Sequence, residues 1–211
     1  MRRLNRARYV WDIIRAKLPH NAIYTAKYFG DVERTAGPAA PVMARSIVNH
    51  FSPKTIIDVG CGTGILLEAF RNHGVRGIGL EYAESALSYC RQRNLEVAKF
   101  NLEKPHNPPY RNERFNLATS FEVAEHLPRS CASRFVKLLC LYSDSIIMTA
   151  APPGQGGNDH VNEQPQSYWI DLFLQQCYRH DKGASARLAD EWQAAGIASW
   201  YHQNVMVFRR S

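Results

Sequence analysis

One segment constrains the fold more than any other part of the chain: Ile56-Ile57-Asp58-Val59-Gly60-Cys61-Gly62-Thr63-Gly64. Its apolar first half predicts a buried strand, and its glycines predict a tight turn with positive φ angles that leads into a helix. Glycine also lets the backbone approach a ligand closely, and open parallel sheets bind ligands at the carboxyl ends of strands. The segment therefore predicts an α/β fold with a ligand site at this turn.

From Thr55 onward, short apolar runs alternate with helical stretches, which is typical of a parallel sheet with helices on both faces. We expect strands near 55–60, 76–81, 96–100, 115–120 and 145–150, and helices near 64–73, 83–93, 129–141 and 166–176. After a helix near 185–195, residues 197–201 and 205–208 are expected to pair as an antiparallel hairpin at the sheet edge.

The chain is expected to divide into an N-terminal helical segment that forms a lid, residues 1–37, and one larger domain, residues 38–211. Apolar residues at helical spacing predict an amphipathic helix over residues 1–18, which Pro19 ends. Residues 20–37 combine aromatic residues with turn-forming glycines, so we expect a partly ordered loop there. A helix from about residue 38 to residue 51 should follow.

Charge and cysteine content narrow the choice of partner and compartment. Lys plus Arg number 26 against 19 Asp plus Glu, and the formal net charge of +7 suits an anionic partner as well as a basic protein that has none. Five cysteines without a CxxC pair indicate neither a zinc knuckle nor a disulfide scaffold, so we expect a reducing, cytoplasmic location. No apolar run reaches the roughly 20 residues that span a bilayer, so we expect no transmembrane segment.

The glycine spacing and an acidic residue after the next predicted strand restrict the ligand. Gly-x-Gly-x-Gly differs from the dinucleotide fingerprint and from the phosphate loop, and no lysine follows to hold a β- or γ-phosphate. The next strand ends in Glu81, whose carboxylate can accept hydrogen bonds from both ribose hydroxyls. On its own, such an acidic residue is more often a solvated loop residue. After the glycine turn, it favours a ribose-containing ligand.

Four segments in order, IIDVGCGTG, GIGLE, FNLE and SFEVAEHL, resemble the motif series of class I S-adenosylmethionine-dependent methyltransferases. The resemblance covers roughly residues 40–210. It implies a Rossmann-like, seven-stranded, mostly parallel sheet with an antiparallel last strand and helices on both faces. It also implies S-adenosylmethionine as the cofactor.

The resemblance further implies which residues hold the cofactor. Asp58 and the turn glycines would surround the methionine moiety, Glu81 would hold the ribose, and residues 101 and 102 would flank the adenine. The family more often has Asp at position 101; the amide oxygen of Asn101 can still accept from the adenine amino group, or the side chain only caps a turn. The expected cofactor-binding set is Asp58, Gly60, Cys61, Gly62, Gly64, Glu81, Asn101, Leu102 and Ser120.

Polar residues follow the fourth predicted strand, where side chains face the transferred methyl group: Glu122, Glu125 and His126. In one interpretation the glutamates organise the loop and His126 caps the next helix. In the other, the side chains coordinate a divalent metal. A similar E-x-x-E-H run carries a metal in ubiquinone-type O-methyltransferases and in methyltransferases that modify small-RNA 3′ ends, but it is also common in relatives without a metal.

The loop over residues 151–169, after the fifth predicted strand, is rich in Gly, Pro and polar residues and carries His160. Such loops at strand carboxyl ends often bind ligands. A hydroxyl acceptor must lose a proton during methyl transfer, so His160 or His126 is the expected general base. We expect this chemistry without a metal. In the alternative, the ligands of a divalent cation are Glu122, Glu125, His126 and His160.

We expect methyl transfer from S-adenosylmethionine to an oxygen of a small molecule or a glycan, because the loop around His160 offers a base and polar contacts. An RNA methyltransferase is the main alternative. The net charge and the basic N-terminal segment favour RNA, but the sequence has no recognisable RNA-binding module. A non-catalytic protein that keeps the cofactor fold is a third hypothesis, which the intact glycines and Glu81 disfavour.

Overall fold

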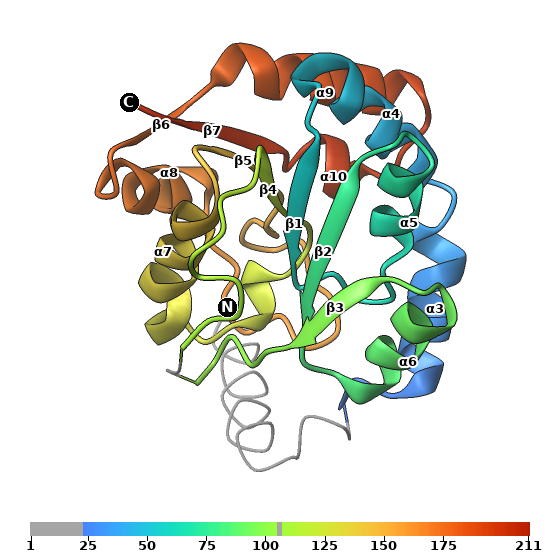
Figure 1. Cartoon of the computed structure of the whole chain (residues 1–211). Coiled ribbons are helices and arrows are strands. Elements are labelled where there is room, and N and C mark those ends of the chain that lie inside the picture. Colours follow the sequence, from blue (N-terminus) through green and yellow to red (C-terminus); the bar gives the residue numbers. More distant parts are fainter. Residues whose placement is uncertain (1–22, 105–106) are drawn as a thin grey trace.

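The computed structural model describes residues 23–104 and 107–211, which form a seven-stranded sheet with helices on both faces (Figure 1). In order across the sheet, the strands are β3 (Glu96–Lys99), β2 (Arg76–Glu81), β1 (Thr55–Val59), β4 (Leu117–Ser120), β5 (Ser145–Met148), β7 (Met206–Arg210) and β6 (Tyr178–His180). The pairs among β1 to β5 are parallel, and β7 is antiparallel to both of its neighbours. The predicted Rossmann-like sheet with an antiparallel last strand is confirmed.

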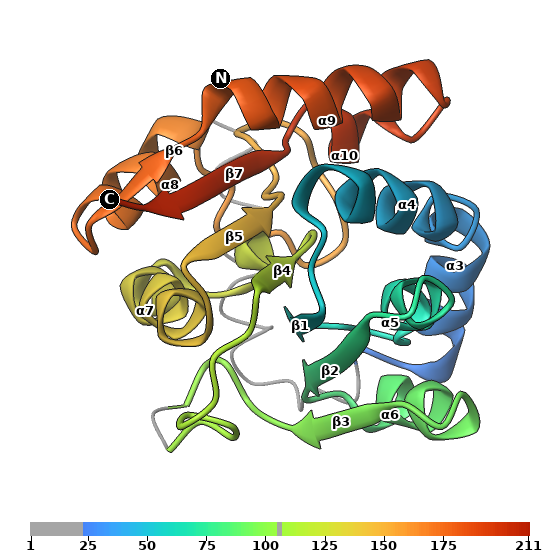
Figure 2. The same cartoon turned by 45° about the horizontal axis from the view of Figure 1, so that its top comes forward.

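The helices cover the sheet on two sides (Figure 2). One face packs against α4 (Ala40–Phe51), α5 (Ile65–Arg71) and α9 (Lys182–Ala194), with α3 (Ala26–Ala36) and α6 (Glu84–Gln92) beside them; the other packs against α7 (Ala132–Tyr142) and α8 (Gln166–Leu174). Short helices in the connections are η1 (Ala124–His126), η2 (Arg129–Cys131) and α10 (Ser199–His202). Within residues 23–104 and 107–211, no helix combines the length and apolar character that a membrane crossing requires.

Strand β1 explains how the two faces are built. Its residues Ile56 and Ile57 are both fully buried, and they point to opposite faces because successive side chains of a strand alternate. Ile56 belongs to the apolar cluster with Ile47 of α4, whereas Ile57 belongs to the cluster with Phe135 of α7. A strand buried on both faces has a continuous apolar sequence, which is why β1 could be predicted.

The strand order determines where a ligand can bind. From β1 the chain passes to β2 and β3 on one side and then returns to β4 on the other side of β1. Loops leaving β1 and β4 therefore diverge, and the crevice between them is the usual ligand position in open parallel sheets. At this crevice Asp58 of β1 lies opposite Thr119 of β4, and Thr119 Oγ1 donates a hydrogen bond of 2.8 Å to Asp58 Oδ1.

The prediction of a partly ordered loop over residues 20–37 is wrong for residues 26–36, which form the helix α3. Thr25 caps this helix, because its Oγ1 accepts a hydrogen bond from the backbone N–H of Tyr28 at 3.2 Å. One face is apolar, and its Phe29 is buried in a cluster with Ala86 of α6. The helix predicted over residues 1–18 lies outside the described residues, and the division at residue 37 stays a prediction.

The prediction of an antiparallel hairpin near the C-terminus is wrong for its first strand, residues 197–201. The segment Ser199–His202 forms α10, and β7 pairs instead with β6, a three-residue strand that lies before α9 in the chain. Ile197, which was part of the predicted strand, is buried with Leu188 and Trp192 of α9. Its apolar side chain therefore serves helix packing rather than strand pairing.

Candidate active site

A cavity of about 730 Å³ opens at the carboxyl ends of β1, β2 and β4. It is lined by the glycine turn after β1, by the residues that follow β2, β3 and β4, by α3, by the loop around residues 155–160 and by α10. Segments that are far apart in the sequence thus meet around one space. Its size is in the range of pockets that hold a cofactor or a drug-sized ligand.

The three glycines of the turn differ in what a side chain at each position would contact. Gly60 has φ +79°, and a Cβ there would lie 2.5 Å from Val123 Cγ2, so glycine lets the turn pass close to the loop after β4. Gly62, with φ +54°, faces the open cavity, where a Cβ would meet only Phe29 at 3.9 Å. Gly64 instead faces α6 and does not line the cavity, because a Cβ there would lie 3.0 Å from Cys90 Sγ.

Glu81 connects the end of β2 to the glycine turn. One carboxylate oxygen accepts a hydrogen bond from Gly62 N at 3.0 Å, and the other accepts from Tyr82 N and Ala83 N at 2.6 and 2.7 Å. Burial raises the pKa of Glu81, and the backbone donors oppose that rise. Glu81 also lines the cavity, so its carboxylate is placed where a ligand hydroxyl can reach it.

Asp58 lies at the end of β1 and is buried, although its carboxylate borders the cavity. Burial raises the pKa of Asp58 to about 7, and the hydrogen bond from Thr119 only partly opposes this rise. A cationic group bound next to Asp58 would reverse the shift.

The remaining expected cofactor residues divide into two groups. Cys61, Asn101 and Leu102 line the cavity. Asn101 Oδ1 accepts a hydrogen bond from Glu103 N at 2.8 Å, so its oxygen also caps the turn after β3. Ser120 does not line the cavity: its Oγ donates to the carbonyl of Val59 at 2.6 Å and ties β4 to β1.

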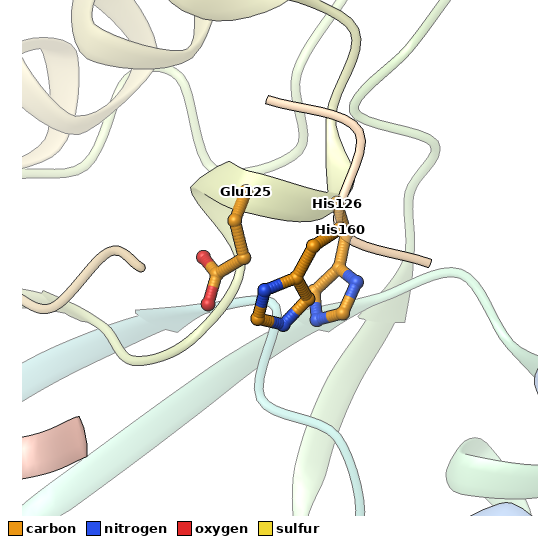
Figure 3. Close-up of side chains that lie close together, drawn as sticks. All are labelled: Glu125, His126 and His160. Atoms are coloured by element: carbon orange, nitrogen blue, oxygen red, sulfur yellow. The ribbon is translucent and has the colours of Figure 1, made fainter. Parts of the chain in front are cut away.

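Across the cavity, η1 and the loop after β5 bring together Glu125, His126 and His160 (Figure 3). Their potential ligand atoms lie within 4.8 Å of one another. Glu125 is completely buried, and neither carboxylate oxygen accepts a hydrogen bond of ordinary geometry from the described residues. A buried carboxylate beside two imidazoles is a set of ligand atoms that fits a divalent cation.

Glu122 lies beside this cluster but outside it. Its φ of +54° is unusual for a residue with a side chain, and its Oε2 accepts a hydrogen bond from Gln155 Nε2 at 3.1 Å. Burial raises the pKa of both Glu122 and Glu125, and the charge of Glu122 adds to the shift of Glu125. A proton or a cation held between the carboxylates of Glu122 and Glu125 would therefore reduce the repulsion between their charges.

Hydrogen bonds orient both imidazoles. His126 Nδ1 lies 3.2 Å from the backbone carbonyl of Asp159, and His160 Nδ1 lies 3.2 Å from Glu163 Oε1. Because these oxygens only accept, they favour the tautomers that carry the proton on Nδ1. Glu163 also accepts from the backbone N–H groups of Gly154 and Gly156, so it organises the loop that carries His160.

Sequence analysis missed several residues of the cavity wall. Tyr28 of α3 and Tyr201 of α10 both line the cavity. Burial, followed by the charge of Glu125, raises the pKa of Tyr28 to about 12, and burial also raises that of Tyr201. Both phenols therefore stay protonated at neutral pH. No sequence signal could identify Tyr201, because its segment was assigned to a strand.

The charge of the cavity is opposite to that of the chain. Acidic residues on its wall include Asp58, Glu81, Glu103 and Glu122, and no Lys or Arg is found among the described residues that line it.

A family model described as "Methyltransferase domain" matches residues 31–139. This chain belongs to the methyltransferase domain family. The matched region contains the glycine turn, Glu81 and the residues that follow β4, so the family predicted from the motif series is confirmed.

The ubiquinone biosynthesis O-methyltransferase of Stutzerimonas stutzeri is 29% identical over 140 residues, which are 61% of this chain and 54% of that protein. The chain spans about half the length, or less, of the curated relatives it matches. The magnesium protoporphyrin IX methyltransferase of Synechocystis, solved with bound S-adenosylhomocysteine, aligns with a TM-score of 0.63, 11% identity and 86% of each chain. A mitomycin 7-O-methyltransferase aligns with a TM-score of 0.63, 14% identity, 88% of this chain and 56% of its own. These structures share the fold.

Proposed function

We propose that this protein is an S-adenosylmethionine-dependent O-methyltransferase whose acceptor is a small molecule without phosphate groups. One observation carries the proposal: a single cavity contains both the glycine turn with Glu81 and the pair His126 and His160. RNA or a nucleotide-linked glycan would bring phosphates against Asp58, Glu81 and Glu122. The charge of the wall therefore favours a small neutral acceptor over the RNA alternative.

On the cofactor side, S-adenosylmethionine would supply a methyl group: the C–O bond to the acceptor would form as the C–S bond breaks, and S-adenosylhomocysteine would leave as a neutral thioether. Glu81 would accept hydrogen bonds from the ribose hydroxyls, and Asn101 with Leu102 would flank the adenine. Asp58, with its pKa raised to about 7 by burial, is ionised more fully when a cationic group lies next to it. These residues fix the direction from which the methyl group faces the acceptor, and alignment is their main contribution to rate.

On the acceptor side, an imidazole removes the proton of the attacking hydroxyl. His126 and His160 each have Nδ1 held by an oxygen, so Nε2 is the atom that takes the proton. Glu125, His126 and His160 are also the residues that would hold a divalent cation, which would lower the pKa of a bound hydroxyl. Tyr28 of α3 lines the same cavity.

Two measurements test this function. Titration calorimetry should show that the purified protein binds S-adenosylhomocysteine, and failure to bind would remove the cofactor assignment. A transfer screen with methyl-labelled cofactor should then show label in phenols or other small hydroxyl compounds. Label that appears only in RNA would overturn the proposed acceptor class but leave the methyltransferase assignment in place.

A further inference from the structure

Two tyrosines of the cavity wall belong neither to the expected cofactor site nor to the pair of imidazoles. Tyr28 lies in α3 and Tyr201 in α10, so they come from opposite ends of the described chain (Figure 1). Both side chains line the cavity. The cavity therefore carries two phenols whose role the reaction described above does not explain.

The ring of Tyr28 is held by neighbouring rings, and its hydroxyl is left for a ligand. The ring lies edge-on to those of Tyr24 and Phe29, with centroids 5.3 and 5.1 Å away and interplanar angles of 89° and 87°. Among residues 23–104 and 107–211, the hydroxyl has no hydrogen-bond partner, and its oxygen is open to the cavity rather than enclosed. A ring of fixed orientation thus presents a donor that a ligand can use.

The surrounding charges place both hydroxyls between the two halves of the site. Burial is the largest cause that raises the pKa of Tyr28 to about 12, and the carboxylates that add to it include Glu125 on the acceptor side and Glu81 on the cofactor side. Burial also raises the pKa of Tyr201, followed by the charges of Glu122 and Glu125, and Tyr28 itself contributes. Because such effects weaken with distance, both hydroxyls lie near the place where the methyl group and the acceptor would meet.

The phenols supply the hydrogen-bond donors that the neighbouring carboxylates lack. An ionised carboxylate only accepts, whereas a phenol that keeps its proton donates. Two donors from different elements suit an oxygen, which has two lone pairs. The attacking oxygen needs its own lone pair for the methyl carbon and gives its proton to a base, so the phenols suit another oxygen of the same compound. A negatively charged oxygen would be repelled by Glu122 and Glu125.

We propose that Tyr28 and Tyr201 determine acceptor specificity: their hydroxyls donate hydrogen bonds to a second, neutral oxygen of the acceptor, apart from the oxygen that is methylated. The inference rests on the proposed function, because it concerns the acceptor side of the same cavity. It restricts the acceptor to neutral compounds with at least two oxygen functions. A compound of the same shape without the second oxygen leaves the phenols unpaired, which costs affinity.

Two pairs of probes with matched shape test the proposal: guaiacol against ortho-ethylphenol, and meta-hydroxybenzaldehyde against meta-vinylphenol. Within each pair an oxygen takes the place of a carbon, and the phenolic hydroxyl stays. Ligand-observed NMR measures the dissociation constants on protein saturated with S-adenosylhomocysteine, so no methyl transfer is needed. In at least one pair the oxygen compound should bind the wild type about fivefold more tightly, the ratio that roughly one net hydrogen bond gives.

Matched variants assign this preference to the two hydroxyls. Tyr28→Phe and Tyr201→Phe each remove one hydroxyl and keep the ring, so each should reduce the preference, and the double variant should bring it within about twofold. The single variants suffice if the double variant does not fold. Tyr89→Phe is the control, because Tyr89 lies on α6 outside the cavity wall, and it should keep the wild-type preference. The Kd of S-adenosylhomocysteine should change less than about twofold throughout.

Equal affinities within both probe pairs for the wild type would overturn the proposal, and so would a preference that survives removal of both hydroxyls. Weaker binding of S-adenosylhomocysteine by Tyr28→Phe with an intact probe preference would assign that hydroxyl to the cofactor and contradict its role here. If the wild type does not bind S-adenosylhomocysteine, the proposed function fails. The same probe pairs on the ligand-free protein then still decide whether Tyr28 and Tyr201 recognise an oxygen.

Discussion

At the scale of single residues, buried carboxylates dominate the site. Burial raises the pKa of Asp58 to about 7 and also raises the pKa values of Glu81 and Glu125, because surroundings of low polarity disfavour the ionised form. The positions of Asp58 and Glu81 at the cavity could be predicted, because both residues stand at strand ends next to the glycine turn. The complete burial of Glu125 could not, because it depends on packing against residues distant in the sequence.

Replacing Glu81 by alanine should weaken binding of S-adenosylhomocysteine by about 1.5–3 kcal/mol, the cost of lost charge-assisted hydrogen bonds to the ribose. The same change leaves the N–H groups of Gly62, Tyr82 and Ala83 without their acceptor, so part of the loss comes from a looser turn. Glu81→Gln keeps one acceptor oxygen and should lose less. Calorimetry of both variants measures the effect, and unchanged affinity in Glu81→Ala would remove Glu81 from the site.

Asp58 should make the stability of the ligand-free protein depend on pH. Its pKa is raised from 3.8 to about 7, so the folded state binds a proton that the unfolded state has already released. The resulting stabilisation is fully present below pH 3.8 and is lost as the pH rises through about 7. Asp58→Asn removes this contribution and should reduce the loss of stability between low and neutral pH by on the order of 4 kcal/mol. Urea unfolding at several pH values tests this, and parallel curves for the two proteins would contradict it.

At the scale of secondary structure elements, Arg93 ties α3 to the cofactor turn. Its guanidinium bonds Glu33 of α3 at 2.6 Å, Glu68 of α5 at 2.9 Å and the carbonyl of Thr63 at 3.3 Å. The side chain is only 17% exposed, so these pairs are better shielded than surface ion pairs. Helix α3 is therefore held in place by charge as well as by its apolar face.

Replacing Arg93 by methionine should lower the free energy of unfolding by about 1–3 kcal/mol, because Glu33 and Glu68 would keep half-buried charges without their partner. The matched control is Arg91→Met. Arg91 pairs with Glu84 at the surface, where its side chain is 59% exposed, so the control should cost less than about 1 kcal/mol. Chemical denaturation measures both variants, and equal losses would show that burial of the Arg93 pairs has no special effect.

The elements that sequence analysis placed correctly have strong local signals. Strands β1, β4 and β5 are buried apolar runs, and the helices that alternate with β1, β2 and β3 favour a parallel sheet. Strand β6 has three residues, too few for a periodic pattern, and it is stabilised by pairing with β7 across the whole of α9. Helix α3 contains Gly30 and aromatic residues that suggest a loop, but its cap at Thr25 and contacts with α6 outweigh those preferences.

At the scale of the whole molecule, the fold assembles the cluster Glu125, His126 and His160 from two connections that follow different strands. Sequence analysis named all of these residues but favoured chemistry without a metal. The complete burial of the Glu125 carboxylate beside both imidazoles supports a bound cation as the alternative to the imidazole base. Only the folded arrangement could supply that argument.

Exhaustive chelation separates the two mechanisms. With an imidazole as the base, methyl transfer should stay within about twofold of the untreated protein, whereas a metal-dependent reaction should be lost and restored by readdition of one of Mg²⁺, Mn²⁺, Fe²⁺ or Zn²⁺. The same ion should raise the thermal midpoint of the wild type but not of Glu125→Gln, because the ion binds only the folded state. Full activity of the metal-free protein would leave His160 or His126 as the base without a cation. Normal turnover of His160→Ala would exclude both roles for that residue.

The place of β7 has a consequence for the order in which the molecule can form. It follows β6 and α9 in the chain, yet it lies between β5 and β6 in the sheet. β5 ends at Met148 and β7 begins at Met206, some 60 residues later. During synthesis from the N-terminus, the outer edge of β5 therefore has no partner strand until β7 has been made. A nascent chain that carries the complete cofactor turn therefore still exposes an open, apolar sheet edge, and it is at this stage that chaperones would protect it from aggregation.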